Sequence, residues 1–85
     1  MIWSLEELKK MALPGLQRLD GELRKKVIGI AEKQEPIVAY DLIEATLKNC
    51  GWAPKEAVQI ARSVSWLAVA RRQNEEFFSA IVAEI

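Results

Sequence analysis

The sequence predicts an all-α fold, a compact bundle of four or five helices in a single domain covering residues 1–85. Apolar residues recur at intervals of three and four, the spacing that places them on one face of a helix. No stretch alternates apolar and polar residues in the way that a half-buried strand does. Proline and glycine lie where helices usually begin and end, at Pro36, Gly51 and Pro54.

The first helix is predicted to begin at a capping box. The Ser4 hydroxyl can accept the Glu7 amide proton, and the Glu7 carboxylate can reach back to Ser4. Leu13-Pro14-Gly15 predicts the end of this helix, because the residue before a proline avoids helical backbone angles.

A second helix follows, with an apolar stripe about four turns long. The stripe consists of Leu16, Leu19, Leu23, Val27 and Ile30. One uninterrupted helix is the favoured interpretation. The alternative is a turn at Asp20-Gly21, with Asp20 capping a helix that begins there.

Glu35-Pro36 is predicted to end the second helix, and residues 37–49 to form the third. Five residues of this segment are expected to face inward, namely Ala39, Leu42, Ile43, Leu47 and Cys50. Gly51 follows at a position where a helix often ends in a left-handed residue.

The fourth helix is predicted to start at Pro54, which suits a first turn. Its apolar stripe is Ala57, Ile60, Ala61, Val64, Leu67 and Ala68. A polar block, residues 71–76, interrupts the pattern and is expected to be exposed to solvent, because burying so many polar groups is costly. Asn74 could cap a separate fifth helix, or one helix of about thirty residues could continue through the block.

The residues that most often carry catalysis are scarce in this chain. It has no histidine, the usual general acid or base near neutral pH and the commonest metal ligand. Its one cysteine, Cys50, cannot by itself build a zinc site or an iron–sulfur cluster. The glycines are scattered and form no phosphate-binding loop. These absences argue against an enzyme, a bound metal and a cofactor.

Charge and hydropathy narrow the classes of partner. The 12 Lys and Arg residues balance the 12 Asp and Glu residues, so no long-range field attracts nucleic acid or anionic lipid. The apolar run that starts at Trp66 is far shorter than the roughly twenty residues that a membrane span needs. The N-terminus has no signal-peptide pattern and a lone cysteine suits a reducing compartment, so we expect a cytoplasmic protein with no membrane insertion.

Two features leave nucleic-acid binding as an alternative. Residues 37–64 can be arranged as a helix-turn-helix with Gly51 at the turn. The second helix would then offer four polar residues to the bases, Lys55, Gln59, Arg62 and Ser63. The run Arg24-Lys25-Lys26 could contact phosphate, although such a run is ordinary on the solvated side of an amphipathic helix.

Part of the same stretch resembles a ubiquitin-associated domain. Leu47 and Cys50-Gly51-Trp52, with Ala57 and Ile60-Ala61 after them, follow the Leu-x-x-Met-Gly-Phe spacing of that family, with a cysteine in place of its loop methionine.

A broader similarity covers residues 3–49. It is carried by Trp3, by Leu13-Pro14, by residues 23–27 and by Glu35-Pro36-Ile37-Val38 ahead of Asp41-Leu42. These residues resemble the small helical domain at the C-terminus of the light-independent protochlorophyllide reductase B subunit. The alignment needs gaps, the bulky residues after the family's proline are missing here, and residues from 52 onward have no counterpart. The resemblance implies an accessory helical domain of a redox enzyme complex.

The composition favours a partner surface. Apolar residues make up 51% of the chain, and the share rises when the 4 glycines are counted, as they are in the usual figure of about 45–50%. We therefore expect a non-enzymatic protein-interaction module that forms a homo-oligomer or binds another protein. The C-terminal helix is its predicted interface, because Phe77 and Phe78 are adjacent and cannot both face one core. The predicted interface residues are Trp66, Val69, Phe77, Phe78, Ile81 and Val82.

Overall fold

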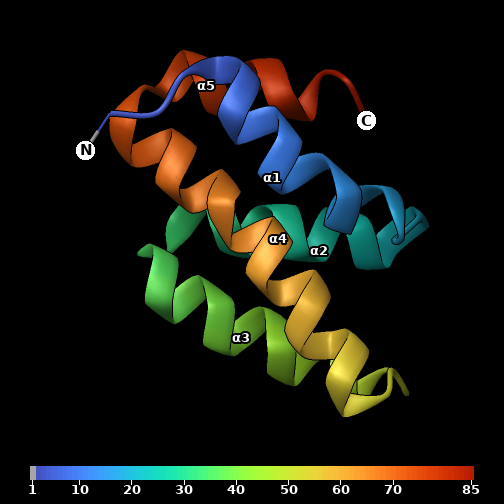
Figure 1. Ribbon diagram of the computed structural model, residues 1–85. Coiled ribbons are helices and arrows are strands. Elements are labelled where there is room, and N and C mark those ends of the chain that lie inside the picture. The colour runs from blue at the N-terminus through green and yellow to red at the C-terminus, as the bar shows by residue number, and fades with distance from the viewer. Residues whose placement is uncertain (1) are drawn as a thin grey trace.

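A computed structural model describes residues 2–85 and contains five helices in that range (Figure 1). They are α1 (Leu5–Gln17), α2 (Gly21–Lys33), α3 (Pro36–Asn49), α4 (Pro54–Gln73) and α5 (Glu75–Val82). The predicted all-α bundle is confirmed. Within the described residues, none of these helices is both long enough and apolar enough to cross a membrane.

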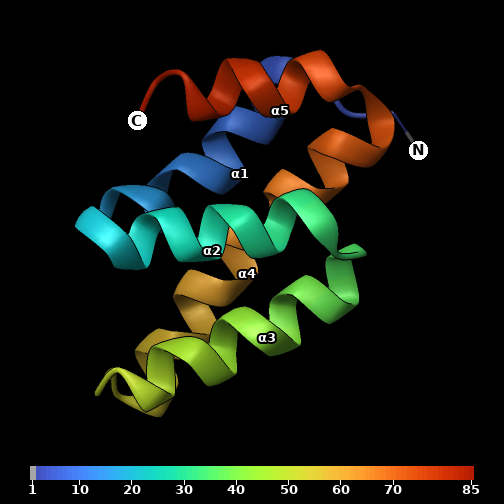
Figure 2. The same cartoon turned by 180° about the vertical axis from the view of Figure 1, so that it is seen from behind.

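The longest helix, α4, is the axis of the bundle, and each of the other four helices packs against it. The six residues of its predicted stripe are all buried, as is Ala70. Many of these residues are alanines, so neighbouring helices can approach α4 closely from several sides. Figure 2 shows α2 and α3 in front of α4, with α5 beside α1 at one end of the molecule and α3 at the opposite edge.

The first helix does not stop at Pro14 but continues to Gln17, so the prediction of its end was wrong. A hydroxyl from α4 accounts for the continuation. Ser63 Oγ accepts a hydrogen bond from Gly15 N–H at 2.8 Å and donates to the Met11 carbonyl at 2.6 Å. The side chain thus serves the backbone beside the proline, where the helical hydrogen-bond ladder has lost a donor.

This bridge requires very close approach of α1 and α4. A Cβ atom at residue 15 would lie 2.6 Å from Ser63 Cβ and 3.0 Å from the Ile60 carbonyl oxygen. Such distances are shorter than real contacts, so glycine is the residue that fits here. Gly15 is buried, and Leu16 and Ala12 around it belong to the core.

The second helix is shorter than the favoured prediction and begins at Gly21, as the alternative stated. Asp20 lies at its N-cap position with extended backbone, but its side chain makes no capping hydrogen bond, so that part of the alternative was wrong. The break places Leu16 in α1 and Leu19 in the connection, where both remain buried. Arg24 of α2 closes the end of α1, because its Nε donates to the carbonyls of Leu16 and Leu19 at 3.1 and 2.8 Å.

The polar block divides two helices, as the alternative with a fifth helix predicted. Asn74 has extended backbone and its side chain accepts a hydrogen bond from Glu76 N–H at 2.9 Å. Four residues of the block are exposed as expected, Arg72, Asn74, Glu75 and Glu76. Arg71 and Gln73 are instead partly buried, which the sequence did not indicate.

Arg71 and Gln73 are partly buried because each one satisfies backbone groups from a distant part of the chain. The Arg71 guanidinium donates to the carbonyls of Ala31 and Gln34, and so caps the end of α2. The Gln73 amide donates to the Trp3 carbonyl and accepts from Trp3 N–H, and so holds the N-terminal segment against α4.

Gly15→Ala is expected to lower the free energy of unfolding by about 1–3 kcal/mol, because the added methyl group collides with Ser63. Gly29→Ala is the matched control, since a Cβ at residue 29 would meet nothing within 4 Å. That change is expected to stabilise α2 by about 0.5–1 kcal/mol. Urea unfolding followed by circular dichroism measures both, and equal effects of the two substitutions would contradict the close approach.

Ser63→Ala is expected to cost about 1–3 kcal/mol, because backbone groups of Met11 and Gly15 lose a partner in a partly buried place. Ser65→Ala is the control. The Ser65 hydroxyl makes only a local hydrogen bond to Arg62 O on the exposed side of α4, and its loss should change stability by less than about 0.5 kcal/mol. The same unfolding experiment compares them, and a Ser63 variant as stable as the Ser65 variant would show that the bridge contributes little.

Candidate functional site

The C-terminal segment packs onto its own chain. Ile81 is 0% exposed, and it is enclosed because α5 lies against both α4 and α1. The other five residues of the predicted interface, Trp66, Val69, Phe77, Phe78 and Val82, are partly buried against the same core. Ile81 therefore offers no surface to a partner in this structure, and the others offer only part of their side chains.

Charged and aromatic contacts hold these elements in place. Glu84, after α5, forms an ion pair with Lys9 of α1 at 2.6 Å. The hydrogen bond that the Lys9 ammonium group donates to this carboxylate raises the pKa of Lys9 above its usual value. The Trp66 ring makes an edge contact with Trp3, with centroids 5.0 Å apart and planes at 80°. The aromatic residues near α5 thus take part in contacts inside one chain.

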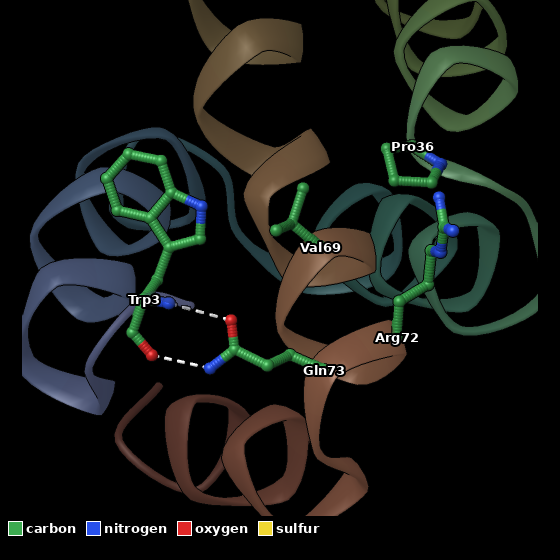
Figure 3. Close-up of a pocket in the computed structure, with 5 residues that line it drawn as sticks. All are labelled: Trp3, Pro36, Val69, Arg72 and Gln73. Atoms are coloured by element: carbon green, nitrogen blue, oxygen red, sulfur yellow. Dashed lines mark hydrogen bonds between the residues drawn. The ribbon is translucent and has the colours of Figure 1, made fainter. Parts of the chain in front are cut away.

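A shallow pocket of about 260 Å³ lies where the N-terminal segment meets α3 and α4 (Figure 3). Its lining comprises Trp3, Pro36, Val69, Arg72 and Gln73. Figure 3 shows Val69 between the Trp3 side and the Pro36 side, while Gln73 binds the Trp3 backbone. Arg72 also forms an ion pair with Glu35 at 3.2 Å, and both side chains are largely exposed. The pocket combines an indole, a proline ring and a guanidinium.

The largest exposed apolar side chains of the helices lie on α3. Ile37 is 78% exposed, Val38 44% and Leu42 42%. With Asp41 and Ala45, which are also exposed, they form the outward side of α3, which we call the α3 face. The expectation that Leu42 and Cys50 point inward was wrong, because both are exposed.

The position of α3 at the edge of the bundle explains the α3 face. This helix packs mainly against α4 and to a lesser extent against α2 (Figure 2). Ala39, Ile43 and Leu47 fill that contact and are fully buried. No other element of residues 2–85 covers the opposite side. A signal for this arrangement was present, because Ile37-Val38 and Leu42-Ile43 are adjacent apolar pairs that cannot all face one core.

A second hollow adjoins the α3 face. It has a volume of about 370 Å³ and is lined by Pro36, Ile37, Tyr40, Arg62 and Ser65. Ile37 thus belongs to the α3 face and also lines a groove between α3 and α4. An apolar side chain from a partner could enter this groove while its neighbours cover Val38 and Leu42.

The fold engages two of the residues considered for nucleic-acid binding, Arg24 and Ser63, in contacts within the chain. Arg24 is occupied by the carbonyls at the end of α1, which leaves Lys25 and Lys26 as the exposed members of the basic run. Ser63 is bound to the backbone of α1 and is partly buried. Of the residues that a helix-turn-helix would offer, Lys55, Gln59 and Arg62 remain exposed.

Few side chains in the part of the chain that the structure describes could bind a metal ion, and the thiol is that of Cys50. Residues 2–85 hold no group of three or more Cys, Asp or Glu side chains arranged to bind a metal ion. Cys50 lies exposed at the C-cap of α3, and Gly51 follows with φ +97°, as expected for a left-handed end of a helix.

No protein-family model, curated protein or solved structure matches the chain.

Substitution of two isoleucines tests whether α5 is buried against the core and the α3 face is exposed. Ile81→Ala is expected to cost about 2–5 kcal/mol, because it opens a cavity in the core. Ile37→Ala should change the free energy of unfolding by less than about 0.5 kcal/mol, since the side chain is mostly in water. Chemical denaturation measures both values. If the Ile37 variant lost as much stability as the Ile81 variant, α3 would be packed differently from the structure.

Proposed function

We propose that this chain is a non-enzymatic helical protein-interaction module, and that the α3 face is its docking surface. The observation that carries the proposal is the exposure of Ile37, Val38 and Leu42 on one side of a well-formed helix. Full burial of an aliphatic side chain of this size is favourable by about 1.5–3 kcal/mol. Covering the α3 face with a protein would therefore supply a substantial driving force for binding.

The α3 face replaces the C-terminal helix as the proposed interface. The sequence predicted a docking surface made of residues that pack against the core of the same chain. Among them, Ile81 is fully buried. The excess of apolar residues that motivated a partner is still present, and its most exposed part within the helices lies on α3. The resemblance of residues 3–49 to an accessory domain of a redox complex stays a prediction, and a docking role agrees with it.

Site-specific photo-crosslinking in cells that make the protein tests the proposal. A benzophenone amino acid at position 37 is expected to capture a protein, because this side chain lies on the docking surface. The same probe at position 22 is the control, since the Glu22 side chain is 93% exposed on α2, away from the α3 face. Adducts from position 37 and none from position 22 support the proposal, whereas the absence of any protein adduct from position 37 contradicts it.

A further inference from the structure

We infer that the partner of the α3 face is a second copy of this chain, docked with the two α3 helices antiparallel about a two-fold axis between Glu44 and Ala45. This inference rests on the proposed function and names its partner. It is carried by the order of charged, small and apolar residues along the exposed side of α3. That order is self-complementary when the helix is reversed.

The charges supply the first part of the argument. With a rise of about 1.5 Å per residue, an axis between residues 44 and 45 places Asp41 of one copy level with Lys48 of the other, and the pair occurs twice. Asp41 and Lys48 are both exposed, and their spacing of seven residues, about two turns, places them on the same side of the helix. Among residues 2–85, Asp41 forms no ion pair within 4.0 Å, so its carboxylate is available.

Lys48 can form an ion pair within its own chain and another with the second copy at the same time. Its ammonium group lies 2.7 Å from Glu44 Oε2 in its own helix. An ammonium carries three donors, so one can bind the Asp41 carboxylate of the second copy while another keeps Glu44. The second copy therefore adds a partner for Asp41 without taking one from Glu44.

The side chains at the axis supply the second part. Ala45 is exposed and small, which lets two helices approach closely at their crossing point. In the same register, Leu42 of each copy lies about 3 Å along the helix axis from Ala45 of the other, and Val38 lies level with Gly51 of the other copy. Leu42 and Val38 thus lie near small residues of the other copy, and no bulky side chain lies at the axis.

Area and net charge bear on the strength of the dimer. A standard interface buries about 800 Å² per partner, whereas the whole chain exposes 5108 Å². One helix about 21 Å long supplies less than the standard area, so the expected dimer is weak and depends on concentration. The net charge of zero leaves no long-range repulsion between two copies.

Charge exchange tests the register. Sedimentation equilibrium from about 10 μM to about 1 mM should show the mass of the unchanged chain rising from one copy toward two. Asp41→Lys and Lys48→Asp should each weaken association by about tenfold or more, because like charges then face each other. An equal mixture of the two variants should associate again, since every pair then joins opposite charges. Lys25→Asp makes the same change of charge as Lys48→Asp, but on α2. It is the control and should associate like the unchanged chain.

A spin label on Cys50 can report the relative orientation of the two α3 helices, because this residue is exposed and is the one cysteine of the sequence. A nitroxide on Cys50 of one copy should broaden backbone amide signals near residues 37–41 of an isotope-labelled Cys50→Ser copy. Broadening confined to residues near position 50 would indicate a parallel arrangement and overturn the inference.

The remaining outcomes separate the inference from the proposed function. A chain that stays monomeric throughout, or charge variants that associate as the unchanged chain does, would overturn the second copy as partner. If position 37 nevertheless captured a different protein in cells, the docking function would stand with another partner. Circular dichroism of each variant checks that the exposed substitutions leave the fold intact.

Discussion

The position of α1 depends on one hydroxyl group between two helices. Ser63 on α4 binds backbone groups of Met11 and Gly15, and Gly15 leaves the space that this contact needs. From this position α1 buries its core residues and packs against α5 as well as α4. A helix that contains a proline thereby continues past it to Gln17, and Gly15 and Leu16 after the proline are buried.

Signals confined to a few neighbouring residues predicted much of the fold. The capping box at Ser4, the cap at Asn74 and the start of α4 at Pro54 all depend on local backbone chemistry and are confirmed. The buried stripe of α4 was also predictable, because a helix with neighbours on several sides carries apolar residues on each side that they cover.

Features set by distant neighbours escaped prediction. Pro14 signals a break unless it is known that α4 supplies a hydroxyl there. Leu42 looked buried because periodicity shows that a helix has an apolar side but not how far its neighbours cover it. The same limit applies to Ile81, which periodicity placed on an apolar side of the C-terminal helix and which neighbouring helices cover completely. Only the adjacent apolar pairs at Ile37-Val38 and Leu42-Ile43 indicated the α3 face.

The central place of α4 also has a consequence for folding kinetics. α3 and α5 are its neighbours along the chain, so their contacts with α4 close short loops, whereas the Gly15–Ser63 contact joins residues 48 positions apart. Contacts between distant residues carry a larger entropy of loop closure and tend to form late. We expect α3, α4 and α5 to assemble first and α1 to dock last. Interactions formed after the transition state chiefly slow unfolding. The hydroxyl between α1 and α4 should therefore determine how long the native state lasts more than how quickly it is reached.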